Sequence, residues 1–320
     1  RGEARGVSVT NAGTIVLAPK LNRMFDSAQS YVWSSAVDAA GNVYLGTGND
    51  GKIFRVGANG AGALFYDAAE LDVTALAIGR DGAIYAGTSP DGKVYRIDQT
   101  GRAEVFFDPD DKYIWSLAAM PDGSLAVGSG ENGKIYRVRA ANASPQTSLL
   151  FDTSETHIIS LAADNQGNLY AGTDSNGLVL RFGADGKPFA LLDSNLREIH
   201  DLSVAPDGSV YALALSEAAS ASRSNPATVT GKTDDGTNVV VAVTSVETTQ
   251  QEQPKSRYDL TTAKSAVYRL TPDGASQIVW SSAGVTGFSV LANPNGNGCL
   301  IGTSDKGRVY SVTNDGRETL

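Results

Sequence analysis

The chain has 320 residues, a net charge of −9 and 41% hydrophobic residues. A surface for nucleic acid needs clustered lysine and arginine, so the acidic balance argues against nucleic acid as a partner. No apolar run reaches the length of a transmembrane segment, and the single cysteine, Cys299, excludes a disulfide framework within the chain.

The first thirty residues contain three short strand-like fragments, at 6–10, 14–18 and 21–25. The last of them runs into Arg23-Met24-Phe25-Asp26, which resembles later stretches such as Phe106-Phe107-Asp108 and Leu150-Phe151-Asp152. The role of these fragments depends on the repeats that follow them.

From residue 31 onward one unit recurs. Its first turn glycine falls at positions 41, 82, 123, 167 and 208, with a sixth copy around 296, so the first four steps are 41, 41, 44 and 41 residues. Each unit has four runs of β-branched and aromatic residues separated by Gly, Asp, Asn and Pro, which is typical of antiparallel strands joined by tight turns. A repeat of this length with four strands indicates a blade of a β-propeller.

We therefore predict an all-β fold, in which residues 1–320 form a single β-propeller of four-stranded antiparallel blades. Six clear repeats begin near Tyr31, Asp72, Tyr113, His157, Glu198 and Val285. Arg23-Met24-Phe25-Asp26 has the pattern of an outer strand, so we expect the N-terminal segment to complete the last blade and close the ring. The ring has seven blades rather than six if the rest of this segment forms a reduced blade.

Residues 216–264 interrupt the fifth repeat. The step from the fifth turn glycine to the sixth is 88 residues, about two periods, yet the segment contains no second copy of the unit. The run 238–246 faces 227–230 across a Gly-containing turn, which predicts a hairpin within an insertion between the second and third strands of the fifth blade. The insertion is either a tolerated surface loop or an arm that binds a partner or covers one face.

Comparison of the repeats separates packing positions from variable ones. The ninth residue before the turn glycine is Val or Ile in the first five repeats, as a packing column requires. The tenth and eighth residues vary in chemistry, and they start the innermost strand, where a propeller has the mouth of its central funnel. The residues in these two columns are Tyr31, Trp33, Asp72, Tyr113, Trp115, His157, Glu198 and His200, and the sixth repeat places Thr286 and Phe288 nearby.

Aromatic surface with a few directed polar groups is typical of a binding site. Tyr and Trp suit both sugar stacking and a protein hot spot. We therefore predict a binding or scaffold protein without a cofactor, which engages a protein partner or a glycan through this funnel face, through the insertion, or through both. The alternative is that Trp33 and Trp115 pack between blades and the polar residues only face solvent.

Stretches such as Val32-Trp33-Ser34-Ser35-Ala36-Val37-Asp38-Ala39-Ala40-Gly41-Asn42-Val43-Tyr44-Leu45-Gly46-Thr47 resemble bacterial propellers of the two-component-regulator and WD-like types. The resemblance covers nearly the whole chain and is strongest to exported proteins in which similar blades continue past the point where this chain stops. It implies a periplasmic or extracellular protein. The absence of Met and of a signal peptide at Arg1 suggests a processed or trimmed chain.

The second interpretation is an enzyme. His157, Glu198 and His200 are similar to the histidines and Glu-x-His of the streptogramin-inactivating lyases, seven-bladed propellers that use magnesium. That resemblance implies proton transfer by His200, with Glu198 and His157 positioning it or the ion, in a metal-assisted lyase or hydrolase. His157 is displaced by two positions from the column that holds His200, and the repeats differ from that family.

Two other positions have ordinary explanations. Asp108, Asp110 and Asp111 lie on one loop and could supply oxygen ligands to calcium, although a solvated acidic loop is the commoner structure. Cys299 falls on a predicted strand, where a small buried hydrophobe is expected rather than a nucleophile.

Overall fold

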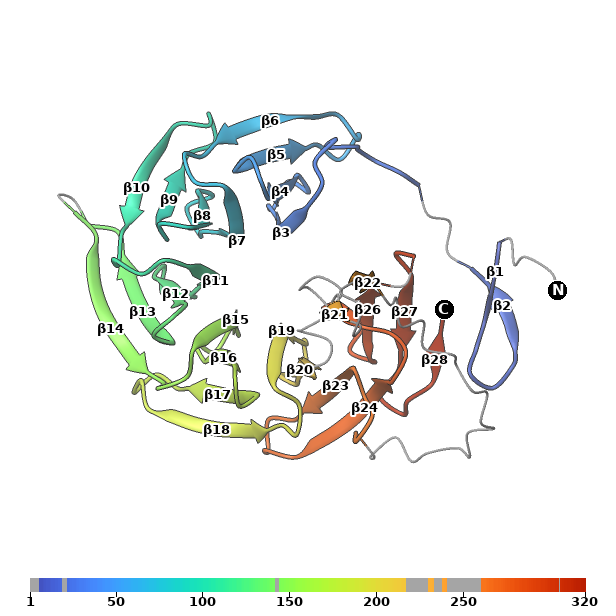
Figure 1. The fold of residues 1–320 in the computed structure, drawn as a ribbon. Helices are drawn as coiled ribbons and strands as arrows, with labels where there is room; N and C mark the ends of the chain where they lie inside the picture. Colours follow the sequence, from blue (N-terminus) through green and yellow to red (C-terminus); the bar gives the residue numbers. More distant parts are fainter. Residues whose placement is uncertain are drawn as a thin grey trace.

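The computed structural model describes residues 6–18, 22–141, 144–216, 230–232, 238–240, 260–304 and 306–320. These residues form antiparallel strands and no helix, so none of them belongs to a helix that could cross a membrane. Most strands group into six consecutive four-stranded units, which Figure 1 shows arranged around a common axis. The predicted all-β propeller fold is confirmed.

The six blades follow the predicted repeats, and their strands pair in chain order. Blade one is β3 (Val32–Val37), β4 (Val43–Thr47), β5 (Lys52–Val56) and β6 (Gly62–Asp67); blade two is β7 (Asp72–Ile78), β8 (Ile84–Ser89), β9 (Val94–Ile97) and β10 (Ala103–Phe107); blade three is β11 (Ile114–Ala119), β12 (Leu125–Ser129), β13 (Lys134–Arg139) and β14 (Gln146–Asp152). Blade four is β15 (His157–Ala163), β16 (Leu169–Asp174), β17 (Leu178–Phe182) and β18 (Pro188–Asp193); blade five is β19 (Glu198–Val204), β20 (Val210–Leu215), β23 (Ser265–Leu270) and β24 (Ser276–Ser282); blade six is β25 (Gly287–Ala292), β26 (Cys299–Thr303), β27 (Val309–Val312) and β28 (Glu318–Thr319).

The core lies between neighbouring blades. Five clusters of buried side chains join blades one and two, two and three, three and four, four and five, and five and six. Cys299 is 1% exposed inside the last of these clusters, and burial raises the pKa of its thiol to about 12. This agrees with the expected small buried hydrophobe. Within the described residues, no such cluster joins blade six to blade one.

One contact recurs between blades, and it explains the packing column. A glycine in the second strand of one blade receives the Val or Ile that begins the next: a carbon added at Gly46 would lie 2.7 Å from Cγ1 of Val73, and one added at Gly128 would lie 2.7 Å from Cγ2 of Ile158. Between blades five and six the large and small residues change places: Leu213 lies at the glycine position of blade five and packs on Gly287, which lies at the Val/Ile position of blade six. Close packing of this kind needs one large and one small partner at each interface.

A hydrogen bond accompanies this contact. The hydroxyl of Ser34 donates to the carbonyl of Val73 at 3.0 Å, Ser116 donates to Ile158 at 2.9 Å, and Ser160 donates to Ile199 at 2.9 Å. At the interface of blades two and three the hydroxyl of Thr74 donates to the carbonyl of Ile114, and at that of blades five and six Asp201 accepts from the amide of Val290. Each blade is thus oriented relative to the next by a close side-chain contact and a hydrogen bond.

The N-terminal segment corrects one prediction. Arg23–Asp26 does not complete blade six, because blade six has its own fourth strand, β28, and residues 22–30 form no strand. The hairpin of β1 (Val7–Val9) and β2 (Ile15–Leu17) lies beside that strand, where the amide of Asn11 donates to the carbonyl of Glu318 at 3.1 Å. Phe25 instead packs on Phe54 of blade one, with ring centroids 5.7 Å apart. The segment therefore runs from blade six, where Thr10 forms an isolated antiparallel bridge with Thr319 of β28, to blade one.

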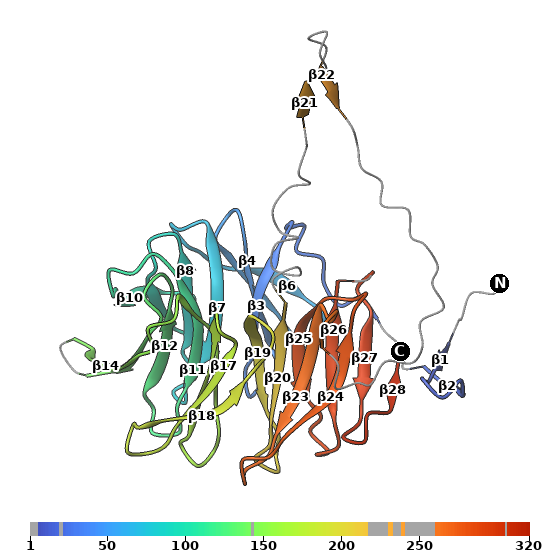
Figure 2. The same cartoon turned by 60° about the horizontal axis from the view of Figure 1, so that its bottom comes forward.

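The insertion leaves the propeller at the end of β20. The amide of Ser216 donates to the carbonyl of Lys264 at 2.9 Å, and β20 pairs with β23 along its whole length. Within the insertion, β21 (Thr230–Lys232) pairs with β22 (Asn238–Val240), so the predicted hairpin is present; the rest of the predicted runs 227–230 and 238–246 lies outside the described residues. Figure 2 shows this hairpin beyond one face of the propeller.

Candidate functional site

The predicted site residues lie at the start of the innermost strands. Figure 1 shows β3, β7, β11, β15 and β19 surrounding the axis of the arc. Glu198, which begins β19, pairs with Leu215, the residue before the insertion departs, so these starts lie on the face from which the insertion leaves. We call the tenth and eighth positions before the turn glycine, in all six blades, the rim.

A β-bulge occurs at the same rim position in every blade. The pairing register shifts between Val32 and Ser34 in blade one, and at the equivalent place in the other five. The residue in the bulge is the eighth before the glycine: Trp33, Thr74, Trp115, Ile159, His200 and Phe288. A bulge releases a residue from the ladder and redirects its side chain. In blade two that side chain still takes part in the packing, because the hydroxyl of Thr74 donates to the carbonyls of Gly87 and Ile114.

The register also resolves the ambiguity in the sixth repeat. Gly287 pairs with Thr303 as Val32 pairs with Thr47. Phe288 is therefore the counterpart of Trp33, and Thr286 is the counterpart of Tyr31.

Two rim clusters have the same construction. In blade one, the rings of Tyr31 and Trp33 stack with centroids 5.2 Å apart and planes 1° apart, and the indole N–H donates to Oδ1 of Asp72 at 3.2 Å. The amide of Asn49 donates to the same oxygen at 3.1 Å. Trp33 is 49% exposed. The tryptophan thus reaches the next blade at the rim while keeping much of its surface in solvent.

In blade three, Tyr113 and Trp115 stack with centroids 5.2 Å apart and planes 16° apart. The indole N–H donates to Nδ1 of His157 at 3.1 Å, and the amide of Glu131 donates to the same nitrogen at 3.2 Å. Nδ1 accepts both bonds, so the ring proton lies on Nε2. Burial lowers the pKa of His157, which favours this neutral form, although Asp174 and Glu131 act in the opposite direction.

Two glycines that the sequence comparison overlooked make room for these tryptophans. A carbon added at Gly48 would lie 2.1 Å from Nε1 of Trp33, and one added at Gly130 would lie 2.4 Å from Nε1 of Trp115. Each glycine follows its tryptophan by 15 residues, and the blades without Trp at the bulge have other residues there. That correlation is visible in the sequence and could have identified both positions.

The third cluster has different chemistry. Nδ1 of His200 lies 2.5 Å from Oε1 of Glu198, and the imidazole meets the ring of Phe288 edge-on with centroids 6.0 Å apart. The carboxylate orients the imidazole from the same strand. The eight predicted residues therefore form three groups, at the interfaces of blades one and two, three and four, and five and six.

The groups do not converge on a metal. Among the described residues no three His, Cys, Asp or Glu side chains are placed to hold an ion, and this applies both to His157, Glu198 and His200 and to the Asp108, Asp110 and Asp111 loop. In that loop the Asp111 carboxylate is buried and accepts bonds from Tyr136 at 2.8 Å and Asn132 at 3.1 Å. Its oxygens are engaged by blade three.

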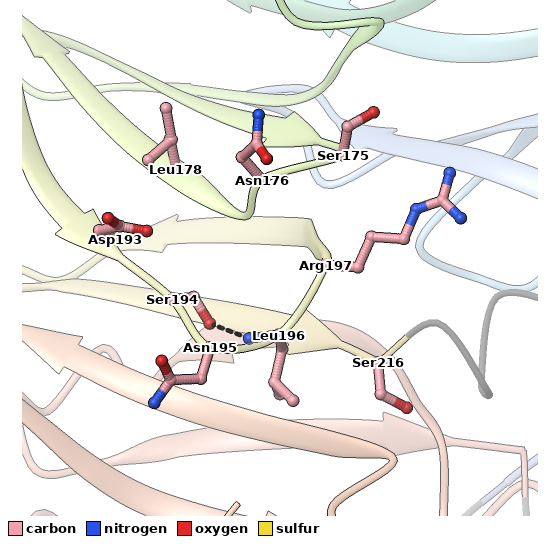
Figure 3. Close-up of a pocket in the computed structure, with 9 residues that line it drawn as sticks. All are labelled: Ser175, Asn176, Leu178, Asp193, Ser194, Asn195, Leu196, Arg197 and Ser216. Atoms are coloured by element: carbon pink, nitrogen blue, oxygen red, sulfur yellow. Dashed lines mark hydrogen bonds between the residues drawn. The ribbon is translucent and has the colours of Figure 1, made fainter. Parts of the chain in front are cut away.

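A recess of about 570 Å³ lies beside the rim between blades four and five (Figure 3). Its walls are polar and include Asn176, Asp193, Ser194, Arg197 and Ser216. The guanidinium of Arg197 donates to Oδ1 of Asp174 at 3.0 Å, which holds this positive charge at one wall of the recess. The recess adjoins the departure point of the insertion.

Comparison with known proteins supports the fold. No protein-family model and no curated sequence matches the chain. Among solved structures, a catalytically inactive virginiamycin B lyase from Staphylococcus aureus with quinupristin is 11% identical, with a TM-score of 0.63, over 96% of this chain and 87% of that one.

The chain in a nidogen/laminin complex is 14% identical, with a TM-score of 0.58, over 87% of this chain and 92% of that one. The extracellular domain of a hybrid two-component system from B. thetaiotaomicron is 16% identical, with a TM-score of 0.58, over 92% of this chain but only 33% of that one. The structural neighbours thus include enzymes and proteins in complexes, and at these identities they show the propeller fold alone.

Proposed function

We propose that the protein is a non-catalytic binding module whose rim binds a carbohydrate chain. The observation that carries this proposal is the duplicated arrangement of a stacked Tyr–Trp pair with an anchored indole, at Tyr31–Trp33 and again at Tyr113–Trp115. Flat aromatic faces suit the apolar faces of sugar rings, and each pair has a polar acceptor from the next blade beside it.

Anchoring strengthens the case for binding. Each indole is fixed by its bond to Asp72 or His157, so its ring plane is set before a ligand arrives. Binding to a preorganised surface loses less side-chain entropy than binding to free rotamers. Two such surfaces two blades apart would contact separate residues of one oligosaccharide.

The test is titration calorimetry with cellohexaose, chitohexaose and laminarihexaose. We expect one of them to bind the wild type, and Trp33→Ala and Trp115→Ala each to weaken binding at least about tenfold, the effect of losing an aromatic hot spot. Phe189→Ala is the control, because Phe189, 57% exposed against 49% for Trp33, is a solvent-exposed aromatic on the outer strand β18. Equal affinity in wild type and both tryptophan variants would overturn the proposal, as would no binding of any of the three sugars.

A second candidate is proton transfer by His200. It is favoured by the 2.5 Å contact with Glu198 and by the position of His200 in the fifth rim bulge. A carboxylate that orients an imidazole is a recurrent arrangement in general acid–base catalysis. We would incubate the wild type and His200→Ala with quinupristin and follow the product by mass spectrometry. Conversion by the wild type that the variant loses would support this function, and equal traces in both would exclude it for this substrate.

A further inference from the structure

Blade one and blade six face each other, and the described residues form no buried cluster between them. We call these two facing surfaces the open side (Figure 1). On blade one, Val32 is 49% exposed, whereas its equivalents Val73, Ile114, Ile158 and Ile199 are each 0% exposed. On blade six, Val309 is 47% exposed, whereas its equivalents Ile53, Val94, Ile135, Val179 and Val267 are 0% exposed. Positions that are core everywhere else are surface here.

The recurring interblade contact is also left half-made at both surfaces. Gly302 of blade six stands where Gly46 and Gly128 receive the next blade, but a carbon added there would meet only Ser289 of its own blade. Val32, which should fill such a glycine position, is not near it. In the described part of the chain, blade six thus has a glycine, Gly302, on which no side chain of another blade packs, and blade one has a valine, Val32, that packs on no glycine.

Residues 24 and 25 occupy the position, beside blade one, of the outer strand of a further blade. Phe25 packs on Phe54 at 5.7 Å, as Tyr66 of blade one packs on Tyr95 of blade two at 5.7 Å; both pairs are 29 residues apart. A carbon added at Gly60 would lie 3.1 Å from the carbonyl oxygen of Met24, as one added at Gly101 would lie 2.9 Å from that of Phe65. Residues 24 and 25 therefore contact blade one as an outer strand contacts the next blade, so only three inner strands are missing.

The chain's own N-terminal hairpin matches the missing strands poorly. Gly13 takes the place of the turn glycine, with φ of 77° against 80° for Gly41. Counting from it, Ala18 falls where Gly46 and Gly128 receive a neighbouring side chain, and Gly6 falls where Ser34 and Ser116 donate. The methyl group of Ala18 would block the space that a glycine leaves open, and Gly6 has no hydroxyl to donate, so the hairpin would not reproduce the recurring contact.

We propose that the open side receives a three-stranded antiparallel meander of the blade repeat, supplied by polypeptide outside residues 1–320. The two surfaces determine which residues this meander needs. Its first strand begins with a β-branched residue, whose side chain fills the space at Gly302 and whose carbonyl accepts from the hydroxyl of Ser289. It also carries a Gly on which the side chain of Val32 packs and a Ser whose hydroxyl donates to the carbonyl of Val32. Residues 22–26 serve as its fourth strand. Burial of Val32, Val37, Leu291, Leu300 and Val309, all more than a third exposed in this structure, provides the driving force.

The test supplies such a meander and measures cysteine accessibility. Residues 113–139, which carry Ile114, Ser116 and Gly128, are fused after Leu320 through a short linker, and the same segment is also added as a synthetic peptide. Val32→Cys and Val309→Cys report the two surfaces by their rate of thiol labelling, while Val73→Cys is the buried control; native Cys299 is buried and contributes little. We expect the fusion, and the peptide at saturation, to slow labelling at both positions at least about tenfold by excluding the reagent.

The matched control is a fusion whose copy of Ile114 is replaced by Asp, which should leave both cysteines accessible. Unchanged labelling in the unmodified fusion would overturn the proposal. Protection of both cysteines in residues 1–320 alone would also overturn it. If deletion of residues 6–18 removed that protection, the N-terminal hairpin would be the occupant of the open side. If the protection depended on protein concentration, the occupant would be a second copy of the chain. None of these outcomes depends on rim binding, so the two proposals fail separately.

Discussion

At the scale of single residues, the rim contains two equivalent hydrogen-bond acceptors, one a carboxylate and the other an imidazole. Oδ1 of Asp72 and Nδ1 of His157 each accept an indole N–H and a backbone N–H in the same arrangement. A carboxylate and a neutral imidazole are interchangeable here because only an acceptor lone pair is needed. The two histidines have different roles, since His157 accepts from a tryptophan of another blade while His200 contacts the carboxylate of Glu198 on its own strand.

Asp201 offers a prediction at this scale. It stands where three other blades have Ser34, Ser116 and Ser160, and it accepts from the amide of Val290 at 2.8 Å. Burial raises its pKa to about 6. The folded state therefore binds the proton more tightly than the unfolded state, so this group's contribution to stability is present below its ordinary value of 3.8 and is lost as the pH rises through about 6.

We expect Asp201→Asn to stabilise the protein by about 1–3 kcal/mol at pH 7.5 and to have little effect near pH 4, because the amide oxygen still accepts from Val290 without a buried charge. Urea unfolding at the two pH values measures this. Asp207→Asn is the control of opposite sign, since the pKa of Asp207 is lowered and the carboxylate pairs with Arg269 at 2.8 Å. Lower stability of Asp201→Asn at both pH values would contradict the argument.

At the scale of elements, the repeat predicted the blades because turn glycines and buried columns recur in the sequence. It could not reveal the bulge, since the ninth and eighth residues are adjacent in the chain and only the pairing register shows that one leaves the ladder. It missed β28, a strand of two residues without an aromatic. It recognised the outer-strand pattern of Arg23–Asp26 and assigned it to the last blade, but these residues form no strand, and sequence does not show that Phe25 contacts Phe54 of blade one.

The insertion gives the prediction at this scale. Residues 217–259 can be replaced by a short Gly-Ser linker, because the β20–β23 ladder and the Ser216–Lys264 bond hold the strands together without them. Loop length alone changes closure free energy by only about 0.6 kcal/mol per doubling, so we expect the Tm to change by no more than about 3 °C.

Differential scanning calorimetry measures the Tm of this deletion. Leu213→Ala, at a side chain that is fully buried against Gly287, is the destabilising comparison. A deletion as damaging as Leu213→Ala would show that the insertion stabilises blade five. Sugar binding retained by the deletion would show that the rim binds without the insertion.

At the scale of the whole molecule, the six blades form an arc with two ends. Each blade is stabilised by its neighbours, and in the part of the chain that the structure describes, blades one and six have a neighbouring blade on one side only. In such arrays stability is close to a sum of unit and interface contributions. We expect backbone amide exchange to be slowest in β12 and β16, at the middle of the arc, and faster in β4 and β26, the corresponding strands at its ends.

Hydrogen exchange followed by mass spectrometry tests this gradient. Comparison of second strands across the blades is a matched measurement, because each of them is paired on both sides with strands of its own blade. Equal protection of all six would mean that the ends are covered in solution. Fusion of the meander from residues 113–139 should raise the protection of β4 and β26 and leave β12 and β16 unchanged.

The six bulges have an evolutionary consequence. Because a bulged residue has left the ladder, a mutation there changes the chemistry of the rim while the neighbouring column, Val or Ile in five blades and Gly287 in the sixth, continues to pack between blades. The Trp, Thr, Trp, Ile, His and Phe found at these places in a single chain show how broad that tolerance is. Selection can therefore vary the rim one blade at a time with little effect on the packing between blades, except in blade two, where the bulged Thr74 itself bonds to the next blade.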